Sequence, residues 1–194
     1  MQHPLKTRVV DFLKRGSQDA RWVFKVLLLG NLSVGKTSLL IRFVEGRFHS
    51  DFGPTIGANF MIKKLTLKPK TEVDLQIWDI SGAIKHQPKL LTKAFYQGAS
   101  GVFLVFDLTR PDTLQSLEEW KREVEQCVGP LPMISIGNKN DLSSQITDDE
   151  IMVTMKRLNV IEQRLSSAKT GEGVSDSFIT LASELLRRAS SSSG

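Results

Sequence analysis

The chain has 194 residues, a length that suits a single domain with one substantial core. Its hydrophobic content of 40% and charged content of 24% are typical of a soluble globular protein, and no apolar run is long enough to cross a bilayer. The net charge of +5 is spread along the chain without an aromatic-interleaved basic stripe, so we expect no nucleic-acid partner. The single cysteine, Cys127, excludes an internal disulfide and favours a reducing compartment, the cytoplasm.

Residues 1–21 form an extension in which Leu5, Val9, Phe12 and Leu13 recur at helical spacing among basic residues. This pattern predicts a short amphipathic helix that needs a surface to order it, because so short a helix is marginal alone in water. The segment could dock on the domain or a partner, lie on an acidic membrane, or stay disordered until a partner binds. We favour docking on protein, because four apolar residues give weak membrane affinity without a lipid chain.

A phosphate-binding loop follows an apolar run at residues 24–29 that reads as a buried strand, and precedes a helix that starts near Ser38. Its backbone N–H groups and the positive end of the helix would enclose a polyphosphate. Lys36 would reach the outer phosphates, and Thr37 would offer its hydroxyl to Mg²⁺. The strand and helix on either side favour nucleotide binding over a ligand-free glycine turn. The pattern G-x-x-x-x-G-K-[ST] is made by Gly30, Asn31, Leu32, Ser33, Val34, Gly35, Lys36 and Thr37.

Further strands are expected at residues 58–67, 73–80, 101–106, 133–136 and 160–165. A short polar turn between the first two of these predicts a hairpin and hence one antiparallel strand. Helix-length segments between the others predict parallel strands with right-handed crossovers. We therefore expect an α/β fold of the P-loop NTPase type, with a six-stranded, mostly parallel sheet flanked by helices.

Three helices are readable in the second half of the chain. One has its apolar face over residues 114–124, and a second begins at a capping box formed by Thr147 and Glu150. The last carries an apolar stripe and ends near residue 188, where basic residues suit the negative end of a helix. The Ser-rich tail at residues 189–194 is expected to be disordered.

A guanine-reading site is predicted from two motifs that follow the last two strands. Because ligands bind at the carboxyl ends of the strands in such sheets, both motifs should converge on the phosphate loop. The carboxylate of Asp141 can accept two hydrogen bonds from guanine N1–H and its amino group, a donor pair that adenine lacks. Lys139 would lie along the base, Asn138 would brace neighbouring loops, and the Ala168 amide would meet the guanine oxygen. The motifs are Asn138-Lys139-Asn140-Asp141 and Ser167-Ala168-Lys169.

Residues 22–188 resemble the Ras superfamily of small GTPases, and most closely the Rab family. Residues 56–60 (IGANF) are similar to the Rab segment IGVDF, 75–79 (LQIWD) to LQIWD, 95–99 (FYQGA) to YYRGA, and 104–109 (LVFDLT) to LVYDIT. The resemblance implies a G domain that switches between GTP and GDP with Mg²⁺ and acts in vesicle or membrane trafficking. Effectors would bind its switch loops and an aromatic surface beside them, and an exchange factor could reload it.

The resemblance also assigns roles that the motifs alone do not. Thr55, in the first switch, would ligate Mg²⁺ and sense the third phosphate, and Asp79 would reach Mg²⁺ through water. The amide of Gly82 would contact the γ-phosphate, and Phe48 would pack against the guanine edge. Rab proteins usually end in prenylated cysteines; this chain as given has none, so we expect at most a peripheral membrane contact.

The second switch departs from the family pattern D-T-A-G-Q-E, because here it reads D-I-S-G-A-I. Ala83 replaces the glutamine that orients the attacking water, and Leu32 crowds a position where relatives carry a small residue. We therefore expect slow GTP hydrolysis, since this reaction depends on positioning and charge stabilisation. The following segment is longer than in typical Rab proteins, so His86 or Gln87 could substitute. A pseudo-GTPase scaffold, permanently GTP-loaded or independent of nucleotide, is the alternative to a switch.

Overall fold

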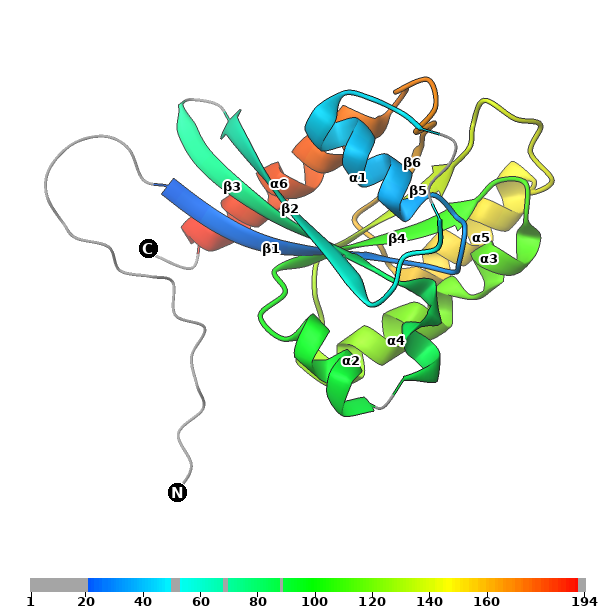
Figure 1. The fold of residues 1–194 in the computed structure, drawn as a ribbon, viewed down its shortest axis with the longest axis horizontal. Coiled ribbons are helices and arrows are strands. Elements are labelled where there is room, and N and C mark those ends of the chain that lie inside the picture. Colours follow the sequence, from blue (N-terminus) through cyan, green and yellow to red (C-terminus); the bar gives the residue numbers. More distant parts are fainter. Residues whose placement is uncertain (1–20, 50–52, 68–69, 88, 192–194) are drawn as a thin grey trace, which may run out of the picture.

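The computed structural model describes residues 21–49, 53–67, 70–87 and 89–191. They form a six-stranded sheet with the strand order β2-β3-β1-β4-β5-β6, in which β2 and β3 are antiparallel and the other neighbours are parallel (Figure 1). The predicted fold class is confirmed. The strands are β1 (Arg21–Leu29), β2 (Ala58–Leu67), β3 (Thr71–Ile80), β4 (Gly101–Asp107), β5 (Met133–Asn138) and β6 (Glu162–Leu165).

Helices cover both faces of the sheet, with α1 and α6 on one face and α2 and α4 on the other (Figure 1). None of the helices in the described ranges is long and apolar enough to span a membrane. The helices are α1 (Lys36–Glu45), the 3₁₀ helix η1 (Gly82–His86), α2 (Lys89–Tyr96), α3 (Pro111–Gln115), α4 (Leu117–Val128), α5 (Asp148–Leu158) and α6 (Val174–Ser191).

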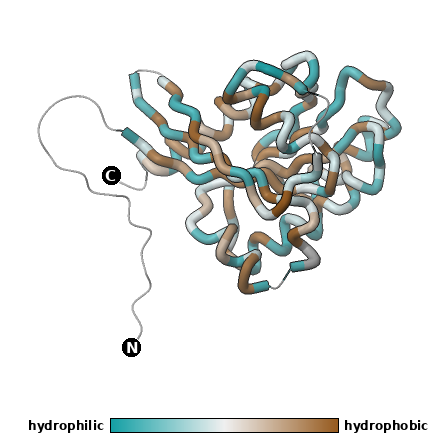
Figure 2. Tube along the Cα trace, in the orientation of Figure 1, coloured by the Kyte–Doolittle hydropathy of each residue, from teal (hydrophilic) through white to brown (hydrophobic). Residues whose placement is uncertain are grey.

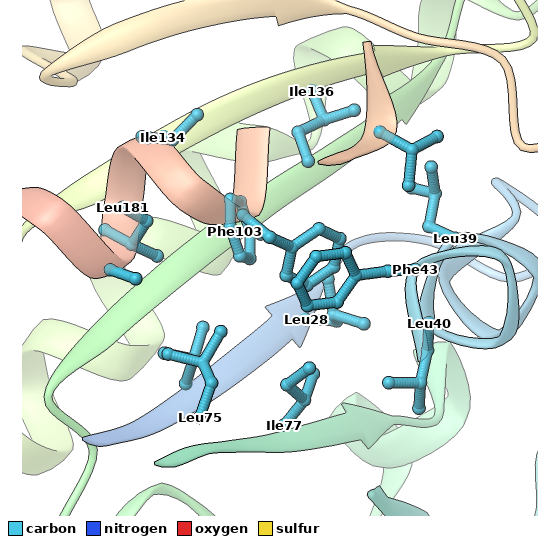
Figure 3. Close-up of a cluster of buried hydrophobic side chains, with 14 of the residues drawn as sticks. Leu28, Leu39, Leu40, Phe43, Leu75, Ile77, Phe103, Ile134, Ile136 and Leu181 are labelled. Atoms are coloured by element: carbon cyan, nitrogen blue, oxygen red, sulfur yellow. The ribbon is translucent and has the colours of Figure 1, made fainter. Parts of the chain in front are cut away.

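Each face of the sheet buries its own hydrophobic cluster. The central strands are hydrophobic along most of their length, as strands buried on both faces must be (Figure 2). Phe43 and Phe103 lie in the cluster under α1 and α6 (Figure 3). The Phe178 ring stacks on the Phe43 ring with centroids 4.1 Å apart, and its centroid is 4.6 Å from that of Phe103. This packing fixes α1 against the sheet, and with it the loop that leads into α1.

Most predicted elements are present, although β6 begins two residues later than predicted and two helices differ from the expectation. The helix expected over residues 114–124 is divided at Ser116, whose hydroxyl donates to the Asp112 carbonyl at 2.6 Å, a side-chain contact that bends helices. Helix α6 extends to Ser191, so residues 189–191 of the tail expected to be disordered are helical. The capping box of α5 is confirmed. The predicted N-terminal amphipathic helix and the end of the tail lie outside the described residues.

The fold brings the chemically interesting segments to one edge of the sheet. The phosphate loop follows β1, Asp79 lies near the end of β3, and Asp107 and Asn138 end β4 and β5. The segment beginning at Ser166 follows β6. These are the carboxyl ends of parallel strands, where open α/β sheets bind ligands.

Candidate nucleotide-binding site

The phosphate loop has a backbone conformation that most residues avoid. Ser33 and Gly35 have φ angles of 62° and 93°. At Gly35 a Cβ atom would lie 2.2 Å from Asn138 Nδ2, so only glycine allows the loop to approach the end of β5 this closely.

Lys36 folds back over the loop that precedes it. Its Nζ donates to the carbonyl oxygens of Gly30 and Asn31, both at 2.8 Å. Burial lowers the pKa of Lys36 to about 8, and although the Asp79 carboxylate opposes this shift it does not cancel it. A buried ammonium that is costly to keep charged is stabilised by an anion, so the position suits a phosphate group.

Two other residues of the loop point in different directions. The Asn31 side chain turns away from the loop and donates to Ser116 Oγ at 2.8 Å, while its oxygen accepts from Trp120 Nε1 at 2.9 Å. Asn31 can therefore contribute to a phosphate site only through its backbone. Leu32 is 46% exposed and lines the adjoining cleft.

Asn138 joins three segments of the site. Its amide nitrogen donates to the Val34 carbonyl at 2.9 Å, and its oxygen accepts from the Ala168 N–H at 3.1 Å. The Ala168 amide, expected to meet the guanine oxygen, thus donates to a side chain in this structure. The phosphate loop and the two predicted guanine motifs are held as one unit.

Asp141 is oriented by its neighbours from the loop after β6. One carboxylate oxygen accepts from Ser167 Oγ at 2.6 Å, and the other lies 3.7 Å from Lys169 Nζ. The Ser167 hydroxyl also accepts the Thr170 N–H at 3.1 Å, which fixes the rotamer that presents it to Asp141. The carboxylate is thereby held at the cleft in one orientation.

The three residues assigned to Mg²⁺ lie together. Thr37 Oγ1 is 2.8 Å from Thr55 Oγ1 and donates to Asp79 Oδ2 at 2.5 Å. Burial raises the pKa of Asp79, and its second oxygen, Oδ1, has no hydrogen-bond partner within the described part of the chain. A buried carboxylate with an oxygen to spare, beside two hydroxyls, fits a hard divalent cation. Mg²⁺ held here would take its other ligands from phosphate and water, and would offset their negative charge.

A cleft of about 650 Å³ opens beside these groups, a volume in the range of small-ligand sites. Asp79 and Ser167 are not among the described residues that line it, but they hydrogen-bond to the lining residues Thr37 and Asp141, respectively. Ala83 and Gln87 are not among the described residues that line it. The predicted residues that line it are Leu32, Ser33, Gly35, Lys36, Thr37, Ser38, Phe48, Thr55, Gly82, Asn138, Lys139, Asp141, Ala168 and Lys169.

The second switch runs from the end of β3 into the 3₁₀ helix η1, and its sequence departures have structural counterparts. Ser81 is buried and its hydroxyl accepts the Ala83 N–H at 3.3 Å, which caps η1. Ile84 is 1% exposed and packs in the cluster under α4. Gln87 is exposed at the end of η1, and the side chain of His86 is not described. Residue 84 therefore anchors the switch in the hydrophobic core.

Sequence reasoning missed several polar contacts of the site. Asp107 forms a 2.6 Å ion pair with Lys139, and Arg110 joins Asp107 to the Leu32 carbonyl. Arg42 of α1 donates to the Ala168 and Lys169 carbonyls at 2.8 and 2.6 Å. The only signal was position: Asp107 directly follows the strand predicted at residues 101–106.

Four residues that line the cleft were likewise not assigned to the site. Each is close in sequence to an assigned residue, and that proximity was the available signal. They are His49, Gly53, Pro54 and Leu142.

Comparison with known proteins agrees with this geometry. A family model described as the Ras family matches residues 25–187. Ras-related protein SEC4 of Saccharomyces cerevisiae is 37% identical over 82% of this chain and 74% of its own length. GTP-binding protein yptV2 of Volvox carteri is 35% identical over 89% of this chain and 80% of its own length. Ras-related protein Rab-1A of Dictyostelium discoideum is 32% identical over 90% of this chain and 86% of its own length.

The chain therefore belongs to the Ras family, and its relatives make it a Rab-like member of the superfamily. It is a GTP-binding switch protein, and members of this family bind GTP and GDP with Mg²⁺.

Proposed function

We propose that this protein acts in vesicle or membrane trafficking as a Rab-like switch with slow intrinsic GTP hydrolysis. The observation that carries the proposal is the cleft in which Lys36, Thr37 and Asp141 line one ligand-sized space, with Thr37 hydrogen-bonded to the buried Asp79. A guanosine polyphosphate would lie there with its base at Asp141 and its phosphates at Lys36. Slow hydrolysis follows from Ala83, whose methyl group offers nothing to orient water.

Effectors would bind next to the switch loops, at an aromatic surface formed by Phe60, Trp78 and Phe95. The Phe60 and Trp78 ring centroids are 5.2 Å apart, and those of Trp78 and Phe95 are 6.4 Å apart. Lys25 Nζ lies 4.3 Å from the Trp78 centroid and donates to the Gln97 carbonyl at 2.8 Å, so it supports the tryptophan ring. Phe60 is exposed, whereas Trp78 and Phe95 are half-buried against the core, and aromatic side chains held in fixed positions suit protein recognition.

The nucleotide that copurifies with the protein tests the proposal. Purified protein is denatured and the released nucleotide is identified by chromatography, with Lys36→Ala as a variant expected to release little. GTP supports a slowly hydrolysing switch, and GDP indicates an active hydrolase. Release of no nucleotide, together with no binding of added GTP, would favour the scaffold alternative.

Any membrane contact would be peripheral, and we propose residues 1–21 as the segment to test. Sedimentation with liposomes that contain anionic lipid, with and without these residues, separates docking on protein from docking on lipid. Salt-sensitive binding that is lost on truncation would assign the segment to the membrane, because basic residues near anionic lipid bind electrostatically.

A further inference from the structure

Three consecutive carbonyl groups of the phosphate loop accept hydrogen bonds from cationic side chains. Lys36 Nζ holds the carbonyls of Gly30 and Asn31, and Arg110 Nη2 holds that of Leu32 at 2.8 Å. Lys36 must turn toward phosphate to bind a nucleotide, whereas Arg110 is not among the described residues that line the cleft. Arg110 can therefore keep its contact while a nucleotide is bound.

The direction of the Leu32 carbonyl determines the direction of the next N–H group. In a planar trans peptide the C=O and N–H point in opposite directions, so holding Leu32 O toward Arg110 aims the Ser33 N–H away from it. Ser33 lines the cleft. Its N–H is thus directed to the side where the phosphates would lie.

Ser33 needs this support because its own conformation is unfavourable. Its φ of 62° lies in the left-handed region, which residues with a side chain seldom occupy. Rotation of the Leu32–Ser33 peptide would relieve the strain and turn the N–H away from the phosphates. A hydrogen bond from a guanidinium to Leu32 O opposes that rotation.

Arg110 is itself held in place. Its Nε lies 3.3 Å from Asp107 Oδ2, the oxygen that also pairs with Lys139 at 2.6 Å. Burial alone raises the pKa of Asp107, but the hydrogen bonds from Lys139 and Thr109 outweigh it and keep the carboxyl ionised. A buried, charged carboxylate therefore connects the base-reading loop to the group that holds the phosphate loop.

We propose that Arg110 is a positioning residue of the phosphate loop, which holds the Leu32 carbonyl and so keeps the Ser33 N–H aimed at the phosphates. The inference rests on the proposed nucleotide site. It adds that Arg110 slows the release of the bound nucleotide.

The test measures release of the fluorescent nucleotide mant-GDP from full-length protein in excess GDP. Arg110→Ala should speed release by about tenfold, the loss expected for one charge-assisted hydrogen bond. Arg110→Lys, which keeps a cationic donor group on a single nitrogen, should give an intermediate rate. Arg122→Ala, an exposed arginine on α4, is the matched control and should stay within about twofold. Should the alanine variant fold poorly, Arg110→Met keeps the apolar stem and predicts the same acceleration.

A double variant distinguishes peptide positioning from a general structural role. In Ser33→Gly the left-handed conformation carries no penalty, so Arg110→Ala should accelerate release by less than about threefold in that background. An undiminished acceleration there, or a twofold or smaller effect of Arg110→Ala alone, would overturn the inference. Failure of the unmodified protein to bind mant-GDP would instead overturn the proposed site, and the inference with it.

Discussion

Gly82, at the start of η1, packs directly against Leu32 of the phosphate loop. A Cβ atom at Gly82 would lie 2.5 Å from the Leu32 nitrogen and 3.0 Å from its Cα. The second switch and the phosphate loop are thus in backbone contact, and any side chain between them must move one of the two. A γ-phosphate bound beside Leu32 would act on the switch through this contact.

Replacement of Gly82 by alanine should therefore impair GTP binding. The new methyl group meets backbone atoms that cannot rotate aside, and overpacking of this kind costs about 1–3 kcal/mol. We expect affinity for a non-hydrolysable GTP analogue to fall by about tenfold or more, measured by fluorescence titration. Equal affinities of the variant and the unmodified protein would show that the switch moves away from Leu32 before nucleotide binds.

Hydrolysis should accelerate when the missing group is restored. Ala83→Gln supplies an amide that can orient water, and Leu32→Gly clears the space beside it. We expect the first change to raise the single-turnover rate by about tenfold or more, and the pair to raise it further. Ala94→Gln, at an exposed alanine of α2, is the matched control. Brisk hydrolysis by the unmodified protein would contradict the argument and direct attention to His86 and Gln87.

The fold was predictable because its signals are local and repeated. Strands buried on both faces have continuous apolar runs in the sequence, and the polar turn at residues 68–71 predicted the single antiparallel pair. The convergence of Lys36 and Asp141 was predictable as well, because each follows a strand of one parallel sheet.

The remaining contacts of the site were not predictable because they join distant segments. The Arg110–Leu32 and Arg42–Ala168 hydrogen bonds span 78 and 126 residues, and no periodicity encodes them. Ile84 was noticed only as a departure from the D-T-A-G-Q-E pattern. Its burial depends on the path of η1 over the core, which the tertiary structure alone defines.

Selection of guanine should depend on Asp141. Asp141→Asn replaces an acceptor by a donor, so GTP should bind much more weakly and xanthosine triphosphate, with a C2 oxygen, should bind better. Competition against mant-GDP by GTP, ATP and xanthosine triphosphate measures the change. Asp149→Asn, on exposed α5, is the matched control. Competition by ATP equal to that by GTP in the unmodified protein would refute the assignment.

Mg²⁺ should slow nucleotide release through Thr37 and Asp79. The Thr37 hydroxyl lies 2.5 Å from Asp79, a buried carboxylate whose other oxygen has no hydrogen-bond partner among the described residues. A hard hydroxyl ligand therefore lies beside a carboxylate that would hold a water of the ion. Removal of Mg²⁺ with EDTA should speed mant-GDP release from the unmodified protein by about tenfold or more, since phosphate charge is then less compensated. Thr37→Val keeps the shape and removes the hydroxyl, so EDTA should change its release rate far less. Thr66 is the matched control: its hydroxyl donates to Glu72 on the β2–β3 hairpin. Release from the Thr66→Val variant should respond to EDTA as it does in the unmodified protein. An equal EDTA effect in the Thr37 variant would mean that this hydroxyl is no ligand of the ion.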